Sequence, residues 1–155
     1  MRILVVEDER LLCDGIAEDL RLEKYTVDCC YDGPAACERL FVEPYDLVVL
    51  DLNLPGMDGL ELARKLNQDY PNIYIMLCTG FDEFEYAKEA VHLEIKEYML
   101  KPISATELSD SLVKLKNTLD KEREEKLNVK KLEDYFQEVL PKLQSNFFIS
   151  LIEGR

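Results

Sequence analysis

The sequence lacks several features that mark other classes of protein. It has no apolar run near the roughly 20 residues that cross a bilayer, and its first residues become acidic too soon for a signal peptide. It also lacks an excess of basic residues. The 32 acidic residues outnumber the 19 Lys and Arg residues, and the formal net charge of -13 repels nucleic acid and anionic lipid. We therefore expect a cytoplasmic protein that does not bind membranes and does not bind DNA or RNA through these residues.

Cysteine and histidine are too few or too scattered for several kinds of site. The five cysteines form an odd set without a CxxC pair, and the adjacent Cys29 and Cys30 would point to opposite faces of a strand. In a cytoplasmic protein we expect reduced thiols with structural roles. The single histidine, His92, lies on a predicted helix away from the strand ends. The chain is therefore not expected to be a histidine phosphodonor.

Hydrophobic periodicity alternates between short apolar runs and longer stretches with helical spacing. With 155 residues, 47% of them hydrophobic, the chain can bury a sizeable core in one domain plus a short extra segment. The apolar runs predict strands at residues 3–6, 26–31, 45–50, 73–78 and 98–100. The helical spacing predicts helices at residues 10–23, 35–42, 60–70 and 84–95. This alternation predicts an α/β fold with a doubly wound, five-stranded parallel sheet.

The last third of the chain has a different apolar pattern. Its leucines follow the four-three-four spacing of a helix seam, at Leu108, Leu112, Leu115 and Leu119. The seam weakens over residues 120–126, where charged residues replace leucine, and it resumes over residues 129–143 after a shift of phase. Pro141 is expected to kink or end this second stretch.

This change of pattern predicts the domain organisation. The composition shifts between residues 105 and 120, so we place one domain at residues 1–119 and a helical linker or dimerisation segment at residues 120–155. The leucine seam predicts a homodimer formed through residues 105–143. The alternative is a helix that folds back onto the first domain and shields its surface.

Polar residues follow the predicted strands at the end where an open parallel sheet forms its sites. These residues are Glu7, Asp8, Asp51, Asn53, Thr79 and Lys101. Three carboxylates brought this close repel one another unless a cation neutralises them, so a divalent ion is implied. Mg2+ prefers oxygen ligands and often shares the phosphate oxygens of a substrate. The cluster therefore fits phosphoryl chemistry.

Taken in order, these segments resemble the receiver domain of two-component response regulators, over about residues 1–119. The resemblance is carried by an acidic triplet at 7–9, VVLDLNLPGMDG at 48–59, LCTG at 77–80 and YMLKP at 98–102. It implies a flavodoxin-like receiver fold, Mg2+ as cofactor and a sensor histidine kinase as phosphodonor.

The same resemblance implies that Asp51 is the phosphoacceptor. It also implies that Mg2+ is held by Glu7, Asp8, Asp51 and the carbonyl of Asn53. Physical chemistry supports these roles, because an ionised aspartate is a nucleophile that can form an acyl phosphate. In-line transfer then requires mainly positioning and neutralisation of the phosphoryl oxygens.

The remaining implied roles belong to a switch. Thr79 and Lys101 bind the phosphoryl oxygens, and Tyr98 is the aromatic residue that moves when the domain changes state. Phosphorylation would bias a surface between two states. The expected output is a changed binding surface and not the turnover of a separate substrate, so we do not expect an enzyme.

The class of output is predicted by two further resemblances. Residues 79–87, together with the long helical tail, resemble AraC-type transcription regulators, which carry two C-terminal helix-turn-helix units. We therefore expect the N-terminal part of a transcriptional regulator whose effector domain is not in this sequence. Residues 46–55 instead resemble winged-helix regulators. This mixture leaves the output class open, with an engineered hybrid as one alternative.

Two other functions remain as alternatives. An aspartate-nucleophile phosphatase also uses Mg2+, but it places its nucleophile in a DxD motif after the first strand, where this chain has an acidic triplet at 7–9. A phosphorylation-independent interaction module could keep the receiver fold. Asp51, Thr79 and Lys101 would then have been free to drift, so their joint presence favours the switch.

Overall fold

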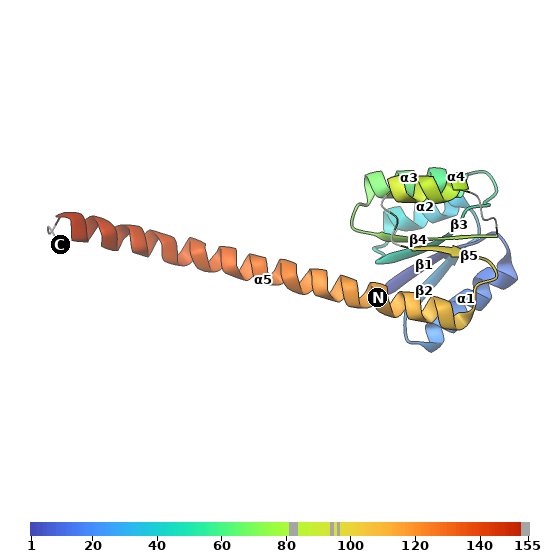
Figure 1. Ribbon diagram of the computed structural model, residues 1–155, viewed down its shortest axis with the longest axis horizontal. Coiled ribbons are helices and arrows are strands. Elements are labelled where there is room, and N and C mark those ends of the chain that lie inside the picture. The colour runs from blue at the N-terminus through green and yellow to red at the C-terminus, as the bar shows by residue number, and fades with distance from the viewer. Residues whose placement is uncertain (81–83, 94, 96, 153–155) are drawn as a thin grey trace. The chain divides into compact units, whose positions relative to one another are not determined.

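The computed structural model describes residues 1–80, 84–93, 95 and 97–152, with side chains for residues 1–80, 88–93, 95 and 97–144. Strands and helices alternate along these residues (Figure 1). The strands are β1 (Arg2–Val6), β2 (Thr26–Cys30), β3 (Leu47–Asp51), β4 (Tyr74–Thr79) and β5 (Glu97–Leu100). The helices are α1 (Arg10–Leu22), α2 (Gly33–Val42), α3 (Gly59–Asp69), α4 (Phe84–His92) and α5 (Ala105–Ile152).

The five strands form one parallel sheet in the order β2-β1-β3-β4-β5. Val5 at the centre of β1 lies beside Cys29 of β2 on one side and Val49 of β3 on the other. Helices α2, α3 and α4 cover one face of the sheet, and α1 covers the other (Figure 1). The predicted doubly wound parallel sheet is confirmed, and its strand order is that of flavodoxin-like folds.

The sheet is buried because helices cover both of its faces. Every residue of β3 and β4 is buried, so continuous apolar runs suit these strands better than alternating ones. On the side of α2, α3 and α4, strand residues such as Leu4 and Leu50 join one hydrophobic cluster with Leu40 and Leu62. This core fixes the carboxyl ends of the strands relative to one another.

Element boundaries differ from the predicted ones by a few residues. α2 begins at Gly33 because the Asp32 carboxylate accepts a hydrogen bond from the Ala35 N–H at 2.7 Å and Pro34 occupies the first turn. α4 ends at His92, before the predicted end near residue 95. Part of the segment that resembles AraC-type regulators, residues 81–83, lies outside the described residues.

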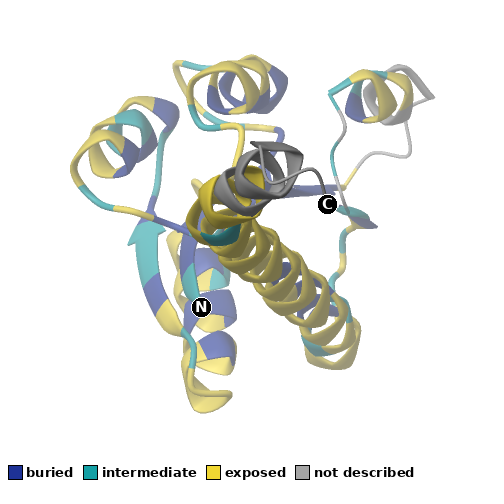
Figure 2. Cartoon of the chain, turned by 90° about the vertical axis from the view of Figure 1, so that its left-hand side faces the viewer, coloured by how far each residue is buried: buried dark blue, intermediate teal, exposed yellow. Residues whose placement is uncertain are grey.

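The chain divides into two compact units, Met1–Ser111 and Leu112–Arg155. Pro141 is predicted to kink or end the helix, and because α5 continues through Pro141, the predicted helix end is wrong. Proline removes one backbone hydrogen bond, and the residues around Pro141 are mostly exposed, so water can satisfy the carbonyl that loses its partner. From residue 120 to residue 144 all side chains are exposed except half-buried Val139 (Figure 2).

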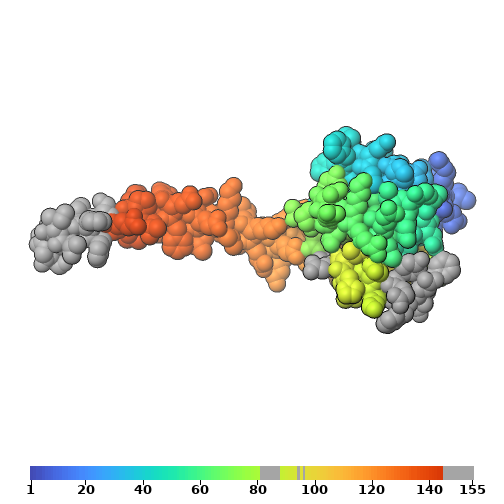
Figure 3. All heavy atoms as spheres, turned by 90° about the horizontal axis from the view of Figure 1, so that it is seen from above, coloured from blue at the N-terminus to red at the C-terminus, as the bar shows by residue number. Residues whose placement is uncertain are grey.

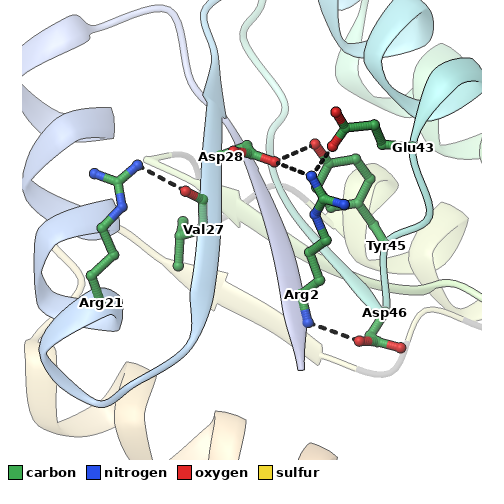
Figure 4. A network of polar contacts seen from close by, with 7 residues as sticks. All are labelled: Arg2, Arg21, Val27, Asp28, Glu43, Tyr45 and Asp46. Carbon is green, nitrogen blue, oxygen red and sulfur yellow. Dashed lines mark hydrogen bonds and ion pairs between the residues drawn. The ribbon is translucent and has the colours of Figure 1, made fainter.

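A network of charged and polar groups joins the start of β1 to β2 and to the segment that leads into β3 (Figure 4). The Arg2 guanidinium donates to Asp28 at 3.1 Å and pairs with Glu43, and it lies 5.0 Å from the centre of the Tyr45 ring. The Tyr45 hydroxyl donates to the same Asp28 carboxylate at 2.6 Å, and the Arg2 N–H donates to Asp46 at 2.8 Å. Burial and the Asp28 hydrogen bond raise the pKa of Tyr45. The network ties three strands together at the end opposite the predicted site.

Candidate functional site

Acidic residues and one lysine meet at the carboxyl ends of the strands. Glu7 and Asp8 follow β1, Asp51 ends β3, and Lys101 follows β5. The Lys101 Nζ atom lies 2.7 Å from Glu7 Oε2 and 3.2 Å from Asp51 Oδ1. Carboxylate oxygens of Glu7, Asp8 and Asp51 all lie within 4.8 Å of one another. Residues that are far apart in the sequence therefore form one compact charged site, as the ends of parallel strands require.

The charges at this site are largely removed from water. The Glu7 and Asp51 side chains are only 4% and 3% exposed, and that of Lys101 is 23% exposed, whereas Asp8 faces solvent. Burial raises the pKa of Glu7 to about 7. The hydrogen bond from Lys101 opposes this shift, and the negative charge of Asp51 adds to it. One lysine therefore does not fully balance the buried carboxylates.

Lys101 itself remains a cation. Burial acts to lower its pKa, but the hydrogen bond to Glu7 and the negative charges of Asp51 and Glu7 outweigh burial, so the pKa is raised. Its backbone position is fixed as well, because the Lys101 N–H donates to the Thr79 carbonyl at 2.6 Å. The ammonium group is thus a fixed positive charge beside Asp51.

The carboxylates fit a divalent hard cation. The Asp51 Oδ1 atom is buried and has no hydrogen-bond partner among the described residues, and its contact with Lys101 is an ion pair at 3.2 Å. Such a buried oxygen is costly unless a cation or donor approaches it. Carboxylate oxygens within 4.8 Å of one another form a donor set that suits Mg2+ better than a soft metal.

The loop after β3 holds the backbone of Asp51 in place. A Cβ atom added to Gly59 would lie 2.5 Å from the Asp51 carbonyl oxygen and 2.5 Å from Leu52 Cα, so only glycine fits there. The Gly59 N–H donates to the Leu52 carbonyl at 3.0 Å, and Asp58 caps α3 through the Leu60 N–H. Hydrophobic periodicity did not reveal this contact, although a glycine at a helix start is a visible signal.

The other predicted residues lie around this cluster. Thr79 is fully buried at the end of β4, and Tyr98 is half-buried in β5, where it packs against the hydrophobic cluster under α2, α3 and α4. Asn53 is exposed in the loop two residues after Asp51. The structure therefore places Thr79 beside the lysine backbone and Tyr98 on the adjoining strand.

A second group of possible metal ligands lies between α1 and β2. Ligand atoms of Cys13, Asp14 and Cys29 are within 4.8 Å of one another. Burial is the largest effect at both thiols and raises the pKa of each; at Cys29 it outweighs the opposing effects of Cys13 and Arg21. The thiols therefore stay neutral at physiological pH. All five cysteines are free. This arrangement fits structural thiols.

Comparison with known proteins agrees with this geometry. The protein-family model of the response regulator receiver domain matches residues 3–113 of this sequence. The chain therefore belongs to the response regulator receiver domain family. Domains of this family are signalling phosphoacceptors and not enzymes that turn over a separate substrate; they bind Mg2+ and work with histidine kinases.

Several relatives are transcriptional regulators. The chain is 36% identical to the uncharacterized transcriptional regulatory protein YesN of Bacillus subtilis over 114 residues, which are 72% of this chain and 31% of YesN. It is 40% identical to the transcriptional regulatory protein CutR of Streptomyces coelicolor over 108 residues, which are 70% of this chain and 50% of CutR. The matching part of the chain thus spans 31% to 50% of the length of these relatives.

A solved structure of similar fold carries ligands of the expected kind. The response regulator TrrA of Thermotoga maritima, crystallised with Mg(2+)-BeF, is 32% identical, with a TM-score of 0.67 over 74% of this chain and 97% of TrrA. In the part of this chain that the structure describes, no helix is both long enough and apolar enough to span a membrane.

Proposed function

We propose that this chain acts in the cytoplasm and that its Asp51 accepts a phosphoryl group from a sensor histidine kinase in a Mg2+-dependent reaction. The observation that carries the proposal is the Asp51 carboxylate, buried at the end of β3 with one oxygen that has no hydrogen-bond partner among the described residues and lies 3.2 Å from Lys101 Nζ. A carboxylate that is desolvated and held beside a fixed cation is well placed to attack a phosphoryl group.

In the proposed reaction an Asp51 carboxylate oxygen attacks phosphorus, a P–O bond forms, and the P–N bond to the donor histidine breaks. The imidazole leaves with the bonding electrons and takes up a proton. Lys101 binds the phosphoryl oxygens and offsets their negative charge. Glu7, Asp8, Asp51 and the Asn53 carbonyl would hold Mg2+, which supplies further positive charge.

The acyl phosphate then acts as the signal. Thr79 sits at the end of β4, and its hydroxyl binds the new phosphoryl group in the proposed active state. Tyr98 packs against the hydrophobic cluster and lies on β5, the strand next to the one that ends in Thr79. In the proposed active state, a movement of Thr79 favours a second position of the Tyr98 ring. The two positions define two states of the surface formed by α4 and β5.

We further propose that this surface controls transcription through a DNA-binding domain of the whole protein. The names of YesN and CutR support this output, and these relatives are two to three times as long as their matching segments. The AraC-like segment favours helix-turn-helix units. We also propose that the chain acts as a homodimer, as the leucine spacing predicts.

Intact-mass spectrometry with acetyl phosphate tests the proposal. We expect the wild type to gain one phosphoryl group with Mg2+ and none without it, and we expect Asp51→Asn to gain none. Asp58→Asn is the matched control, because it changes a carboxylate of the same loop while Asn caps helices as well as Asp. No gain in folded wild-type protein would instead support a phosphorylation-independent interaction module.

A further inference from the structure

Helix α5 carries two apolar faces that point in different directions. Leu112, Leu115 and Leu119 are buried, at 0%, 7% and 7% exposure. A second set, here called the outer stripe, consists of Val129, Leu132, Phe136, Val139 and Leu143. At about 100° per residue, the centre of the outer stripe is rotated roughly 110° from that of the buried leucines. The outer stripe is therefore not a continuation of the buried face.

The outer stripe is exposed although it is strongly apolar. Val129, Leu132, Phe136 and Leu143 are 54% to 57% exposed. Figure 3 shows the helix segment that carries them in space-filling form, coloured orange to red by residue number. Its three-four-three-four spacing repeats every seven residues, which is the pattern of a helix that pairs with another helix. Contiguous apolar surface of this kind marks an interaction site, because a single helix gains little stability in water without a covered face.

We propose that the outer stripe pairs with the outer stripe of a second copy of this chain. This inference rests on the homodimer of the proposed function and locates its surface. A stripe that covers an identical stripe needs no other partner, since a two-fold pair is self-complementary. With Tyr135 and Leu140 beside it, the stripe exposes on the order of 600 Å2 per copy, and a pair would bury about 1,200 Å2, which is enough for a specific interface.

Charge sets where the pairing begins. A seven-residue register continued from Leu119 would place Glu122 and Lys126 on the seam. In a parallel, in-register pair, Glu122 would face Glu122 of the second copy and Lys126 would face Lys126 of the second copy. These like charges would repel one another. Pairing therefore starts at Val129 and uses residues 129–143, a shorter region than the seam at 105–143 suggested by leucine spacing.

The helix that carries the outer stripe is continuous. α5 is helical without interruption from Leu119 to Val129, a separation of about 15 Å along its axis. Pairing of the outer stripe with a second copy keeps every backbone hydrogen bond of this stretch.

The chain offers a matched control for the test. Leu127 is 52% exposed on the same helix, but it lies roughly 160° from the centre of the outer stripe. Leu132→Asp and Phe136→Asp each place a carboxylate on the stripe, whereas Leu127→Asp places the same carboxylate on the opposite side. The three variants have nearly the same effect on charge and helix propensity.

Light scattering coupled to gel filtration measures the outcome at micromolar concentrations of the whole chain. We expect wild type and Leu127→Asp to have twice the chain mass of 18.0 kDa, and Leu132→Asp and Phe136→Asp to have the mass of one chain. Far-UV circular dichroism should show helix content falling on dilution of the wild type. Near-UV circular dichroism checks that each variant keeps its folded receiver.

Three outcomes would overturn the inference. A wild type that is monomeric with or without the phosphoryl group would refute the homodimer, and dimers of Leu132→Asp and Phe136→Asp would refute this surface. Equal dissociation of Leu127→Asp would refute the assignment to one face. Phosphorylation of Asp51 is read separately by intact mass on the same samples, so failure of the switch chemistry is distinguishable from failure of the pairing.

Discussion

The charge imbalance at Glu7 predicts an unusual dependence of stability on pH. Without Mg2+, the pKa of Glu7 in the folded protein is about 7, against 4.5 in an unfolded chain. Between these pH values the folded protein keeps a proton at Glu7 that the unfolded chain has released. Stability therefore falls as pH rises from 4.5 to 7. At about 1.4 kcal/mol for each pH unit, the loss in the free energy of unfolding is on the order of 3 kcal/mol.

Urea unfolding at a series of pH values measures this loss. The sequence has eight tyrosines and no tryptophan, so near-UV circular dichroism of tyrosine is a suitable signal. Glu7→Gln keeps an acceptor for Lys101 but cannot ionise, and the difference between wild type and this variant isolates Glu7 from all other carboxylates. Saturating Mg2+ should remove the fall, because the ion favours the ionised carboxylate.

The result that would refute the reasoning is a wild type whose stability follows the same pH curve as Glu7→Gln in the absence of Mg2+. That outcome would mean that Lys101 alone balances both buried carboxylates. A fall that persists unchanged in saturating Mg2+ would show that Glu7 does not contribute to the metal site.

Three further changes separate chemistry from stability. Lys101→Met should abolish the phosphoryl mass gain, and an unchanged mass gain would contradict the role of the lysine. Without Mg2+, the same substitution should lower the free energy of unfolding by about 3–5 kcal/mol, because it leaves buried carboxylates without a counter-charge. Gly59→Ala should lower the free energy of unfolding by about 1–3 kcal/mol, because the added methyl group would clash with the Asp51 backbone. Gly15→Ala has nothing within 4 Å of the added methyl group and should raise the free energy of unfolding by about 0.5–1 kcal/mol. Urea unfolding measures both changes. Tyr45→Phe should lower the free energy of unfolding by about 1–2 kcal/mol, because the hydrogen bond to Asp28 is lost, and it should leave the phosphoryl mass gain unchanged.

Sequence patterns predict the sheet and the site because both depend on local features. Glu7, Thr79 and Lys101 each end or directly follow a strand, as Asp51 does at the end of β3, so their positions follow from the strands and from the geometry of parallel sheets. The predicted ends of the strands differ from the observed ends by only a few residues, because apolar runs are also local features of the sequence. Spacing thus predicts which residues meet at the edge of the sheet.

Contacts between distant elements could not be predicted in this way. The approach of Gly59 to the Asp51 backbone depends on how the loop after β3 closes, and periodicity carries no information on that path. The continuation of α5 past Pro141 depends on solvent access to the backbone, which a rule about proline alone does not contain. The network around Arg2 joins three strands whose partners are separated by up to 44 residues.

The two ends of the sheet use charge in opposite ways. Near the amino end of β1, Arg2 forms ion pairs with Asp28 and Glu43, so opposite charges are held together. At the carboxyl ends of β1 and β3, Glu7 and Asp51 share a single lysine, so like charges are held together. The first arrangement stabilises the fold, and the second stores repulsion that a bound cation can relieve. Substitutions at Arg2 should therefore lower stability without changing the chemistry, whereas Glu7→Gln should raise stability at pH 7 without Mg2+ and weaken the Mg2+ response.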